Sequence, residues 1–369
     1  MRPASDAERA RLNDTFAALC RIASPFGHER ACSERIRAEL QGMGIRAEED
    51  AAGNLLARVA GRGERSILLC AHMDTVDDGG VPIEPVLVDE GWENANDGIL
   101  GADNKAAVAV ILELARRCSV EGSPVGLELL FTVSEEDALA GAKQFDASRL
   151  GAEFGYVFDH ATPIGEVVTA SPTYYRIAAD FHGRAAHAGI RPEAGRSAIV
   201  AAAGAIAAMP LGRLDEQTTA NVGSIHGGAG STNIVPERCR LLAETRSLDA
   251  ARVEEVVAQL VDAIHDGASH AECDVDVTSE RLFTGYRTKP GAPVVQAAEA
   301  ALRACGYEPR RIVTGGGSDA NALEAAGLPC VNLANGTERN HEPTERVSVA
   351  ALEGMLDVAF VLLDEAAAA

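Results

Sequence analysis

The chain is poor in aromatic and basic residues. Aromatic side chains make up 4% of its 369 residues, with a single Trp. Only 33 Lys and Arg face 55 Asp and Glu, which gives a formal net charge of -22 at pH 7. A surface this acidic repels nucleic-acid phosphates and anionic lipid headgroups, so we expect neither nucleic acid nor a membrane as partner. The hydrophobic content of 47% is typical of a globular protein.

Closely spaced cysteines and long apolar runs are also missing. The eight cysteines occur singly, with no pair at metal-ligand or redox spacing, so we expect reduced thiols in the core. The longest apolar stretch, residues 198–210, is too short to span a bilayer, and the first residues lack the apolar core of a signal peptide. These features predict a cytoplasmic protein.

An unbroken apolar run at residues 67–71 predicts a strand buried on both faces of a sheet. It leads into His72 and Asp74. Side chains two positions apart on an extended segment point to the same side, so both can face one cavity at the carboxyl end of the strand. A metal-bound imidazole steadied by a carboxylate fits this pair. The alternative is a surface His and Asp in a turn, and this pair alone does not decide between the two.

Two further predicted strands end in potential metal ligands. Residues 125–133 are followed by Glu135 and Glu136, and residues 154–158 by Asp159. In isolation, an acidic surface turn would explain the two glutamates equally well. Their position at the end of a predicted parallel strand favours a site instead.

A helix is predicted at residues 106–118, with Asp103 or Asn104 near its cap. Backbone N–H groups at a helix N-terminus favour a negative charge there. Strands that alternate with helices predict an α/β domain, whose mainly parallel sheet is flanked by helices and carries its site beyond the carboxyl ends of the strands.

The pattern changes near residue 171. The order strand, helix, strand, strand, helix, strand is that of a ferredoxin-like α+β unit, here at residues 174–181, 198–208, 220–225, 239–246, 251–268 and 273–278. The alternating pattern then resumes. We therefore expect an α/β domain in two parts, residues 1–172 and 289–369, with residues 173–288 inserted as a second domain. The glycine-rich segment at residues 315–321 lacks the Lys of a phosphate-binding loop and the Gly spacing of a dinucleotide fingerprint.

Eight motifs occur along the chain in a recognisable order. They are Ala-His-Met-Asp-Thr-Val (71–76), Gly-Ala-Asp-Asn-Lys-Ala (101–106), Ser-Glu-Glu (134–136), Phe-Asp (158–159), Gly-Arg-Ala-Ala-His-Ala-Gly (183–189), Ser-Thr-Asn-Ile-Val-Pro (231–236), Gly-Gly-Gly-Ser-Asp-Ala-Asn (315–321) and Asn-His-Glu-Pro (340–343). This set resembles the peptidase T-like branch of the dinuclear zinc aminoacylase and carboxypeptidase family. The resemblance covers about residues 70–345.

The resemblance implies a ligand set for two Zn²⁺ ions, with Co²⁺ or Mn²⁺ as alternatives. Asp103 would bridge the two ions, with His72 and Asp159 on one ion and Glu136 and His341 on the other. A shared carboxylate offsets the repulsion between two dications, and His and carboxylate ligands without thiolates are typical of catalytic zinc.

The resemblance also implies roles in catalysis and substrate binding. Asp74 would orient His72, Glu135 would be the general base, and His187 would stabilise the oxyanion, often from the partner subunit. Five further positions would bind substrate: Asn233, Arg246, Gly316, Gly317 and Ser318. An Arg suits a peptide carboxylate, although Arg246 could equally form an ion pair on the face of a sheet.

Two positions depart from the family pattern. His160 stands where relatives usually have Gly, and it could narrow the pocket, compete as a ligand or face away. Asn104 stands where relatives often carry another acid, which is expected to weaken metal affinity slightly.

The implied activity is that of a tripeptide aminopeptidase-like exopeptidase acting on short peptides through a hydroxide shared by two zinc ions. An N-acyl amino acid deacylase or a carboxypeptidase would use the same machinery, so both remain alternatives. A non-catalytic binding relative is the alternative of another class, but the ligands and the base are all present. The resemblance implies that residues 1–172 and 289–369 form the catalytic domain and residues 173–288 a lid and dimerisation domain. The exposed sheet edge of this inserted domain pairs in relatives to form a dimer, so we expect a homodimer.

Overall fold

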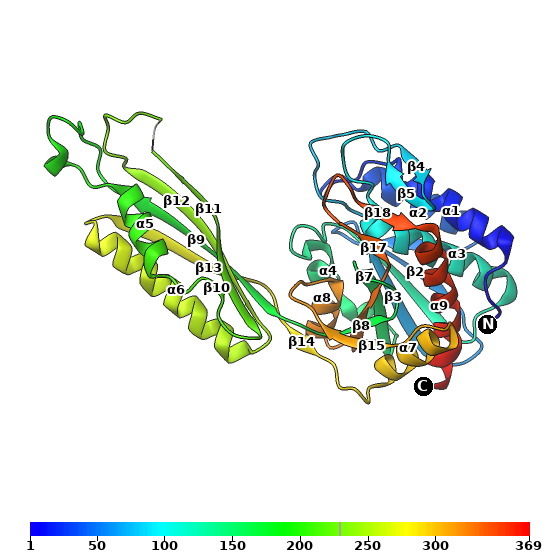
Figure 1. The fold of residues 1–369 in the computed structure, drawn as a ribbon. Helices are drawn as coiled ribbons and strands as arrows, with labels where there is room; N and C mark the ends of the chain where they lie inside the picture. Colours follow the sequence, from blue (N-terminus) through cyan, green and yellow to red (C-terminus); the bar gives the residue numbers. More distant parts are fainter. Residues whose placement is uncertain (229) are drawn as a thin grey trace. The chain divides into compact units, whose positions relative to one another are not determined.

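The computed structural model describes residues 1–228 and 230–369 and divides into two compact units (Figure 1). Unit 1 comprises Met1–Ala170 and Arg287–Ala369, and unit 2 comprises Ser171–Tyr286. These boundaries fall two residues before those expected from the sequence. No helix in the described part of the chain combines the length and apolar character needed to cross a bilayer.

Unit 1 is built on a nine-stranded sheet in the order β1-β2-β6-β3-β7-β16-β8-β14, with β15 paired to β8. The central pairs β6-β3, β3-β7 and β7-β16 are parallel, which confirms the predicted α/β class with a mainly parallel sheet. The strands are β1 (Ala47–Glu49), β2 (Leu55–Val59), β3 (Ser66–His72), β6 (Gly126–Thr132), β7 (Phe154–His160), β8 (Glu166–Ser171), β14 (Tyr286–Arg287), β15 (Arg310–Val313) and β16 (Cys330–Ala334).

Helices cover both faces of this sheet (Figure 1). The helices of unit 1 are α1 (Asp6–Cys20), α2 (Arg30–Gly42), α3 (Ala102–Glu121), α4 (Ala140–Gln144), α7 (Pro293–Ala304), α8 (Asp319–Ala325) and α9 (Val349–Ala368). Alternation along β3 assigns its side chains to the two layers. Leu69 and Ala71 join the core that includes α3, whereas Cys70 contacts Asp319 of α8. The side chain of His72, two residues further along the strand, points to the same face of the sheet as that of Cys70.

A small sheet that the sequence did not predict lies at the edge of unit 1. Its order is β17-β18-β5-β4, formed by Thr337–Glu338, Arg346–Ser348, Gly91–Asn94 and Pro85–Val88. Trp92 on β5 packs edge-on against Phe16 and donates from Nε1 to Asn13 Oδ1 at 2.8 Å. Residues 85–94 are thus anchored to α1 and, through β18, to the chain after His341.

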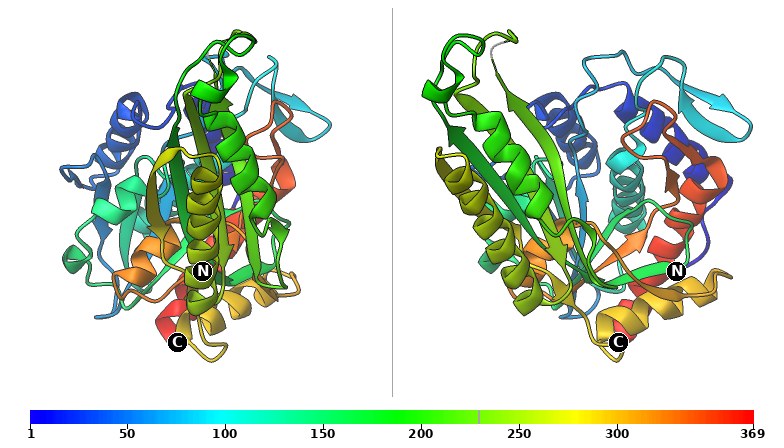
Figure 2. Two further views of the ribbon diagram at one scale, coloured as in Figure 1. Left: turned by 90° about the vertical axis from the view of Figure 1, so that its left-hand side faces the viewer. Right: turned by 60° about the vertical axis from the view of Figure 1, so that its left-hand side comes forward.

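Unit 2 is a five-stranded antiparallel sheet in the order β10-β11-β12-β9-β13, with α5 and α6 on one face (Figure 2). The sequential order β9, α5, β11, β12, α6, β13 and the order of the strands in the sheet are those of the predicted ferredoxin-like unit. Its elements are β9 (Thr173–His182), α5 (Ala198–Ala208), β10 (Gly212–Arg213), β11 (Thr218–Gly227), β12 (Arg238–Ser247), α6 (Ala250–His270) and β13 (Asp274–Phe283). Two short 3-10 helices, η1 (Ala147–Arg149) in unit 1 and η2 (Pro192–Ala194) in unit 2, complete the elements.

Candidate metal centre

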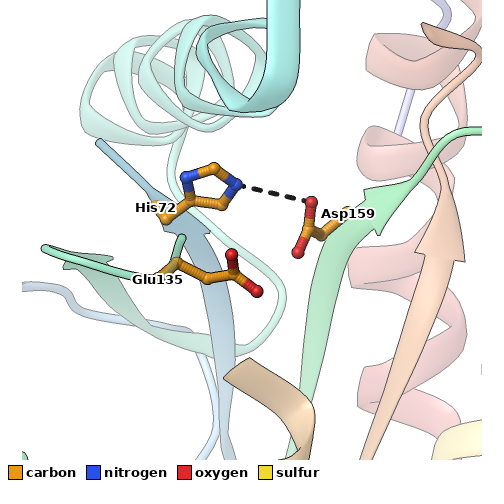
Figure 3. Close-up of side chains that lie close together, drawn as sticks. All are labelled: His72, Glu135 and Asp159. Carbon is orange, nitrogen blue, oxygen red and sulfur yellow. Dashed lines mark ion pairs between the residues drawn. The ribbon is translucent and has the colours of Figure 1, made fainter. Parts of the chain in front are cut away.

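The centre lies where three neighbouring parallel strands end. His72 is the last residue of β3, Asp159 is the penultimate residue of β7, and Glu135 follows the end of β6. The register pairs His72 with Thr132 of β6, so the loop that carries Glu135 begins beside the imidazole. Figure 3 shows these three side chains close together, His72 from β3, Asp159 from β7 and Glu135 from the loop after β6. The apolar runs form the strands, and each run ends where its polar residues meet those of its neighbours.

His72 forms the centre of the first group. Its Nε2 lies 3.2 Å from Asp103 Oδ1 and 3.5 Å from Asp159 Oδ1 (Figure 3). His72 is 1% exposed. The other ring nitrogen, Nδ1, lies 3.1 Å from the backbone oxygen of Asp74. An Nδ1–H donated to that oxygen leaves the lone pair of Nε2 directed towards the two carboxylates, which is the tautomer a metal ligand needs.

His341 occupies the opposite side of Asp103. Its Nε2 lies 3.2 Å from Asp103 Oδ2 and 2.9 Å from Glu136 Oε1. The two oxygens of Asp103 thus face two different imidazoles, one brought by β3 and one by the segment before β18. A carboxylate held between two ligand groups in this way has the disposition of a bridge between two cations.

The donors in this space suit divalent cations. Two overlapping sets, His72 with Glu135 and Asp159, and His72 with Asp103 and Glu136, each bring one atom per residue within 4.8 Å of the others. Nitrogen and carboxylate oxygen without thiolate is the donor chemistry of catalytic zinc and related metals. The structure brings all five predicted ligands together, so the residues present fit the implied metals.

The histidine pKa values reflect the crowding of acids. Burial acts to lower the pKa of His72, but Asp159, Asp103 and Asp74 outweigh it and hold the pKa well above its ordinary value. Hydrogen bonds to Asp103 and Glu136 raise the pKa of His341 to about 10. Protons on these imidazoles occupy the positions that cations would take.

The carboxyl groups divide into two kinds. Burial acts to raise the pKa of Asp103, but hydrogen bonds from His341 and His72 outweigh it and hold the pKa well below its usual range. Burial, followed by the charge of Asp159, raises the pKa of Glu135 well above the ordinary value. Burial, followed by the charge of Asp103, does the same to Asp159. Acids that repel each other in a buried space are stabilised by a bound dication.

Asp74 holds the loop after β6 as well as facing His72. Its Oδ1 accepts from the backbone N–H of Glu135 and its Oδ2 from that of Glu136, both at 3.0 Å. Oδ1 also lies 3.5 Å from Nδ1 of His72. One fully buried carboxylate therefore fixes the directions in which the two adjacent glutamates leave the chain.

Glu29 and Asn54, which were not predicted from the sequence, support the same loop. Ser134 in this loop has a positive φ of 50°, and Glu29 Oε1 accepts from both the N–H and the hydroxyl of Ser134 at 3.0 Å. Asn54 accepts from the N–H of Val133 at 3.1 Å and donates to Gly141 O at 3.0 Å. These contacts hold a backbone conformation that non-glycine residues rarely adopt. Nothing in the local sequence around Glu29 or Asn54 distinguishes them from ordinary polar residues.

The predicted substrate loop at residues 315–321 carries a further missed residue, Asp319. Its Oδ2 accepts hydrogen bonds from Thr132 on β6 and from the Cys70 thiol on β3, and it is 1% exposed. Burial raises its pKa to about 6.

The predicted substrate-binding residues of this loop lie just before Asp319. Ser318 is buried and forms a capping box with Asn321 at the start of α8. Gly316 donates its N–H to Thr314 Oγ1 at 3.0 Å, and Gly317 follows it in the same half-buried turn.

The two departures from the family pattern lie in different surroundings. Burial lowers the pKa of the His160 imidazole, and neither of the two donor sets found among the described residues includes it. Asn332 fixes its neighbour Asp159, accepting from the backbone N–H at 2.8 Å and donating to the carbonyl at 3.1 Å. Asn104 is fully buried, and neither atom of its amide has a hydrogen-bond partner among the described residues. Asp103 and Asn104 both have non-helical dihedral angles, so α3 becomes regular only after them.

The predicted residues of unit 2 lie in two places. The chain around His187 pairs with the chain around Ile234, and Ala188 N–H donates to Asn233 O at 2.9 Å, so His187 and Asn233 share one loop pair. Arg246 lies on β12 with its guanidinium 4.1 Å from the centroid of the Tyr174 ring and 3.2 Å from Glu244. The sheet-face ion pair weighed in the sequence analysis is therefore present.

Comparisons with known proteins cover nearly the whole chain. A family model described as the peptidase dimerisation domain matches residues 174–272, and one described as peptidase family M28 matches residues 54–161. Aminopeptidase PepT from Bacillus cereus has 35% sequence identity and a TM-score of 0.88, covering 97% of this chain and 99% of that one. A tripeptidase from Staphylococcus aureus has 33% identity and a TM-score of 0.92, covering 98% and 99%. The uncharacterized protein YqjE of Bacillus subtilis is 35% identical over 97% of this chain and 98% of its own length.

The fold and the comparisons together define a metallopeptidase with an inserted dimerisation unit. Its α/β unit carries a candidate centre built of histidines and carboxylates. More narrowly, the chain belongs to the M20 family of metallopeptidases, and the predicted resemblance to the peptidase T-like branch is confirmed.

Proposed function

We propose that this chain is a metal-dependent aminopeptidase that removes the N-terminal residue from short peptides, tripeptides foremost. The observation that carries the proposal is Asp103, whose two oxygens lie between His72 and His341 at 3.2 Å each. Support for the substrate class comes from the whole-chain similarity to structures described as an aminopeptidase and a tripeptidase.

We assign the ligands as the sequence predicted. Asp103 would be shared, His72 and Asp159 would hold one Zn²⁺, and Glu136 and His341 would hold the other; Co²⁺ or Mn²⁺ would suit the same donors. When bound, the metals would polarise the scissile carbonyl and lower the pKa of water, which is the chemistry that amide hydrolysis at neutral pH requires.

The remaining residues move protons and hold substrate. Glu135 accepts the proton of the attacking water and returns it to the leaving amine; it lies beside the donor atoms of His72 and Asp159 and is not one of the assigned ligands. Asp74 keeps the backbone of Glu135 and Glu136 in place. We assign oxyanion stabilisation to His187 and the polar groups of the substrate to five residues: Asn233, Arg246, Gly316, Gly317 and Ser318.

The direction of cleavage tests the proposal. A tripeptide of three different residues, its N-acetyl form and its C-terminal amide are incubated with zinc-loaded protein, and the first product is identified by mass spectrometry. We expect release of the N-terminal residue from the free tripeptide, no cleavage of the N-acetyl form, and loss of turnover with chelator that zinc restores. Release of the C-terminal residue first, or removal of the acetyl group, would replace the aminopeptidase with the carboxypeptidase or deacylase alternative.

We also propose that the chain forms a homodimer through unit 2 and functions in the cytoplasm. The match to a dimerisation domain supports the first point. In the described part of β11, residues 221–227 pair only with β12, which leaves their outer edge available for another strand. Light scattering coupled to size exclusion measures the mass, and a monomer at micromolar concentration would contradict the dimer. Fractionation of expressing cells tests the location.

A further inference from the structure

Glu345 is a buried acid outside the assigned catalytic set. It lies four residues after His341, just before β18, and is 2% exposed. Its carboxylate turns towards the start of α3. Oε2 accepts from the N–H of Leu100 at 2.8 Å and from that of Gly101 at 2.7 Å, and Oε1 accepts from the N–H of Asp103 at 2.9 Å. One side chain thus binds three of four consecutive residues that lead to the shared ligand.

These three donors need an outside acceptor because of the local backbone. Gly101 has a left-handed φ of 72°, and Asp103 has a ψ of 104°, so the first turn of α3 is not helical. The N–H groups at a helix start have no partner within the helix, and a buried N–H without a partner costs stability. A carboxylate supplies enough lone pairs for three such bonds. A glutamine of the same length has one oxygen and would turn its amide N–H groups towards a backbone donor.

The position of Glu345 is electrostatically unfavourable in itself. Its charge adds to that of Asp103, which itself lies beside Asp159 and Glu136. A buried acid beside like charges is retained only where its hydrogen bonds offset the repulsion or where bound cations do. The three backbone hydrogen bonds of Glu345 meet the first condition. Cations bound by Asp103 would meet the second.

The segment that carries Glu345 also carries a ligand. Glu342 N–H donates to Arg339 O, and Glu345 N–H donates to Glu342 O, so residues 339–345 form consecutive turns. His341 reaches Asp103 Oδ2 from one end of this segment, while Glu345 holds the backbone of Asp103 from the other. The segment therefore holds Asp103 in two ways: Glu345 binds the backbone of Asp103, and His341 contacts its carboxylate.

We propose that Glu345 is a positioning residue for the metal pair: by accepting hydrogen bonds from Leu100, Gly101 and Asp103, it directs the two oxygens of Asp103 towards the two metal positions. The inference rests on the proposed function only in requiring that Asp103 binds metal. Removal of such an outer hydrogen bond in metalloproteins typically lowers metal affinity by about 10-fold to 100-fold.

Zinc binding to the full-length protein tests this role without peptide. Metal-free wild type, Glu345→Gln and Glu338→Gln are titrated with Zn²⁺ against a chromogenic chelator at a temperature well below unfolding. Thermal unfolding of each metal-free protein is recorded in parallel. Glu338 is an exposed acid on β17, directly before this segment, and serves as the matched control. We expect a zinc affinity about 10-fold to 100-fold lower for Glu345→Gln and unchanged for Glu338→Gln.

The outcomes separate a positioning role from a structural one. A Glu345→Gln protein with a lower unfolding temperature but wild-type zinc affinity overturns the inference. If Glu345→Gln does not fold, Glu345→Asp takes its place, because it keeps the charge but is one methylene too short for all three bonds; wild-type affinity in that variant also overturns the inference. Wild-type protein that takes up none of Zn²⁺, Co²⁺ and Mn²⁺ overturns the proposed function and this inference together.

Discussion

The two units of the molecule differ in where their charged side chains lie: unit 1 buries several of them, whereas unit 2 keeps them at the surface. In unit 1 the sheet is covered by helices on both faces, and titratable side chains are buried beside the strand ends, among them His72, Asp74 and Asp103. In unit 2 the helices cover one face, and the alternate side chains on the other face, such as Arg176 and Asp180 of β9, are exposed or half-buried. A doubly covered sheet shields its strand ends from water, so charges there interact strongly, whereas the charges of unit 2 are screened. Metal chemistry is therefore expected in unit 1 and recognition in unit 2.

The largest effect is expected from the base in unit 1. Glu135→Ala is predicted to lower kcat by about 10²-fold to 10⁴-fold because proton transfer to and from the substrate is lost. Zinc content should stay at the wild-type level, since the assigned ligands remain. Steady-state kinetics on a tripeptide and metal analysis of the same sample measure both. Wild-type kcat in the variant would remove Glu135 as the base, and loss of zinc would make it a ligand.

A buried ion pair gives the next largest effect. Glu8 accepts from Arg117 at 2.7 Å and 2.9 Å, and the Arg117 side chain is 1% exposed. Glu8→Gln leaves the buried guanidinium without its counter-charge, which typically costs about 3 to 5 kcal/mol of unfolding free energy. Calorimetry of the metal-free protein should show a lower unfolding temperature for the transition of unit 1.

The same carboxylate makes the stability of unit 1 sensitive to acid. Burial acts to raise the pKa of Glu8, but hydrogen bonds from Arg117, Arg2 and Ser5 outweigh it and hold the pKa well below its usual range. Its contribution is fully present above the ordinary glutamate pKa of about 4 and is lost as pH falls towards the folded value. The difference in unfolding free energy between wild type and Glu8→Gln should therefore become smaller as the pH is lowered below about 4. A difference that grows on acidification would contradict this sign.

Arg246 tests the assignment of recognition to unit 2. If it binds the carboxylate of the peptide, Arg246→Ala loses a charged hydrogen bond of about 1.5 to 3 kcal/mol, which is about a 10-fold to 100-fold rise in KM. The C-terminal amide of the same tripeptide is the control, because the variant should add no further loss on it. An equal rise in KM on the free tripeptide and on its C-terminal amide would show that Arg246 acts through its contacts with Glu244 and Tyr174 and does not bind the substrate carboxylate. Zinc affinity should not change in either case.

The smallest effect is expected from an exposed ion pair of the same length as the Glu8 pair. Arg176 lies 2.7 Å from Glu280 on the open face of unit 2, with 48% and 60% of the side chains exposed. Glu280→Gln is expected to change unfolding free energy by less than about 1 kcal/mol, because water screens both charges. Calorimetry of this variant beside Glu8→Gln measures the contrast directly. A cost equal to that of Glu8→Gln would remove the distinction between the units.

Much of this arrangement could be predicted from patterns close in sequence. The run before His72 predicts a buried strand because every side chain in it is apolar, and the alternation in 239–246 matches β12, which has one covered face. The small sheet of β4, β5, β17 and β18 was missed because its strands are short and β5 pairs with β18, more than two hundred residues away. Short strands carry little periodicity, and a pairing this distant leaves no local signal.

The sequence by itself determined the two kinds of unit, the strand ends that supply chemistry and the set of predicted ligands, since periodicity and motifs are local properties of the chain. Only the tertiary structure decided which acids face inwards to hold backbone N–H groups. Glu29 and Glu345 cannot be told from surface acids along the chain, yet each is buried against a segment of the centre that lies far away in sequence. The physical reason is that a carboxylate acquires such a role from the donors that folding brings to it, and those donors belong to the main chain, which every residue shares.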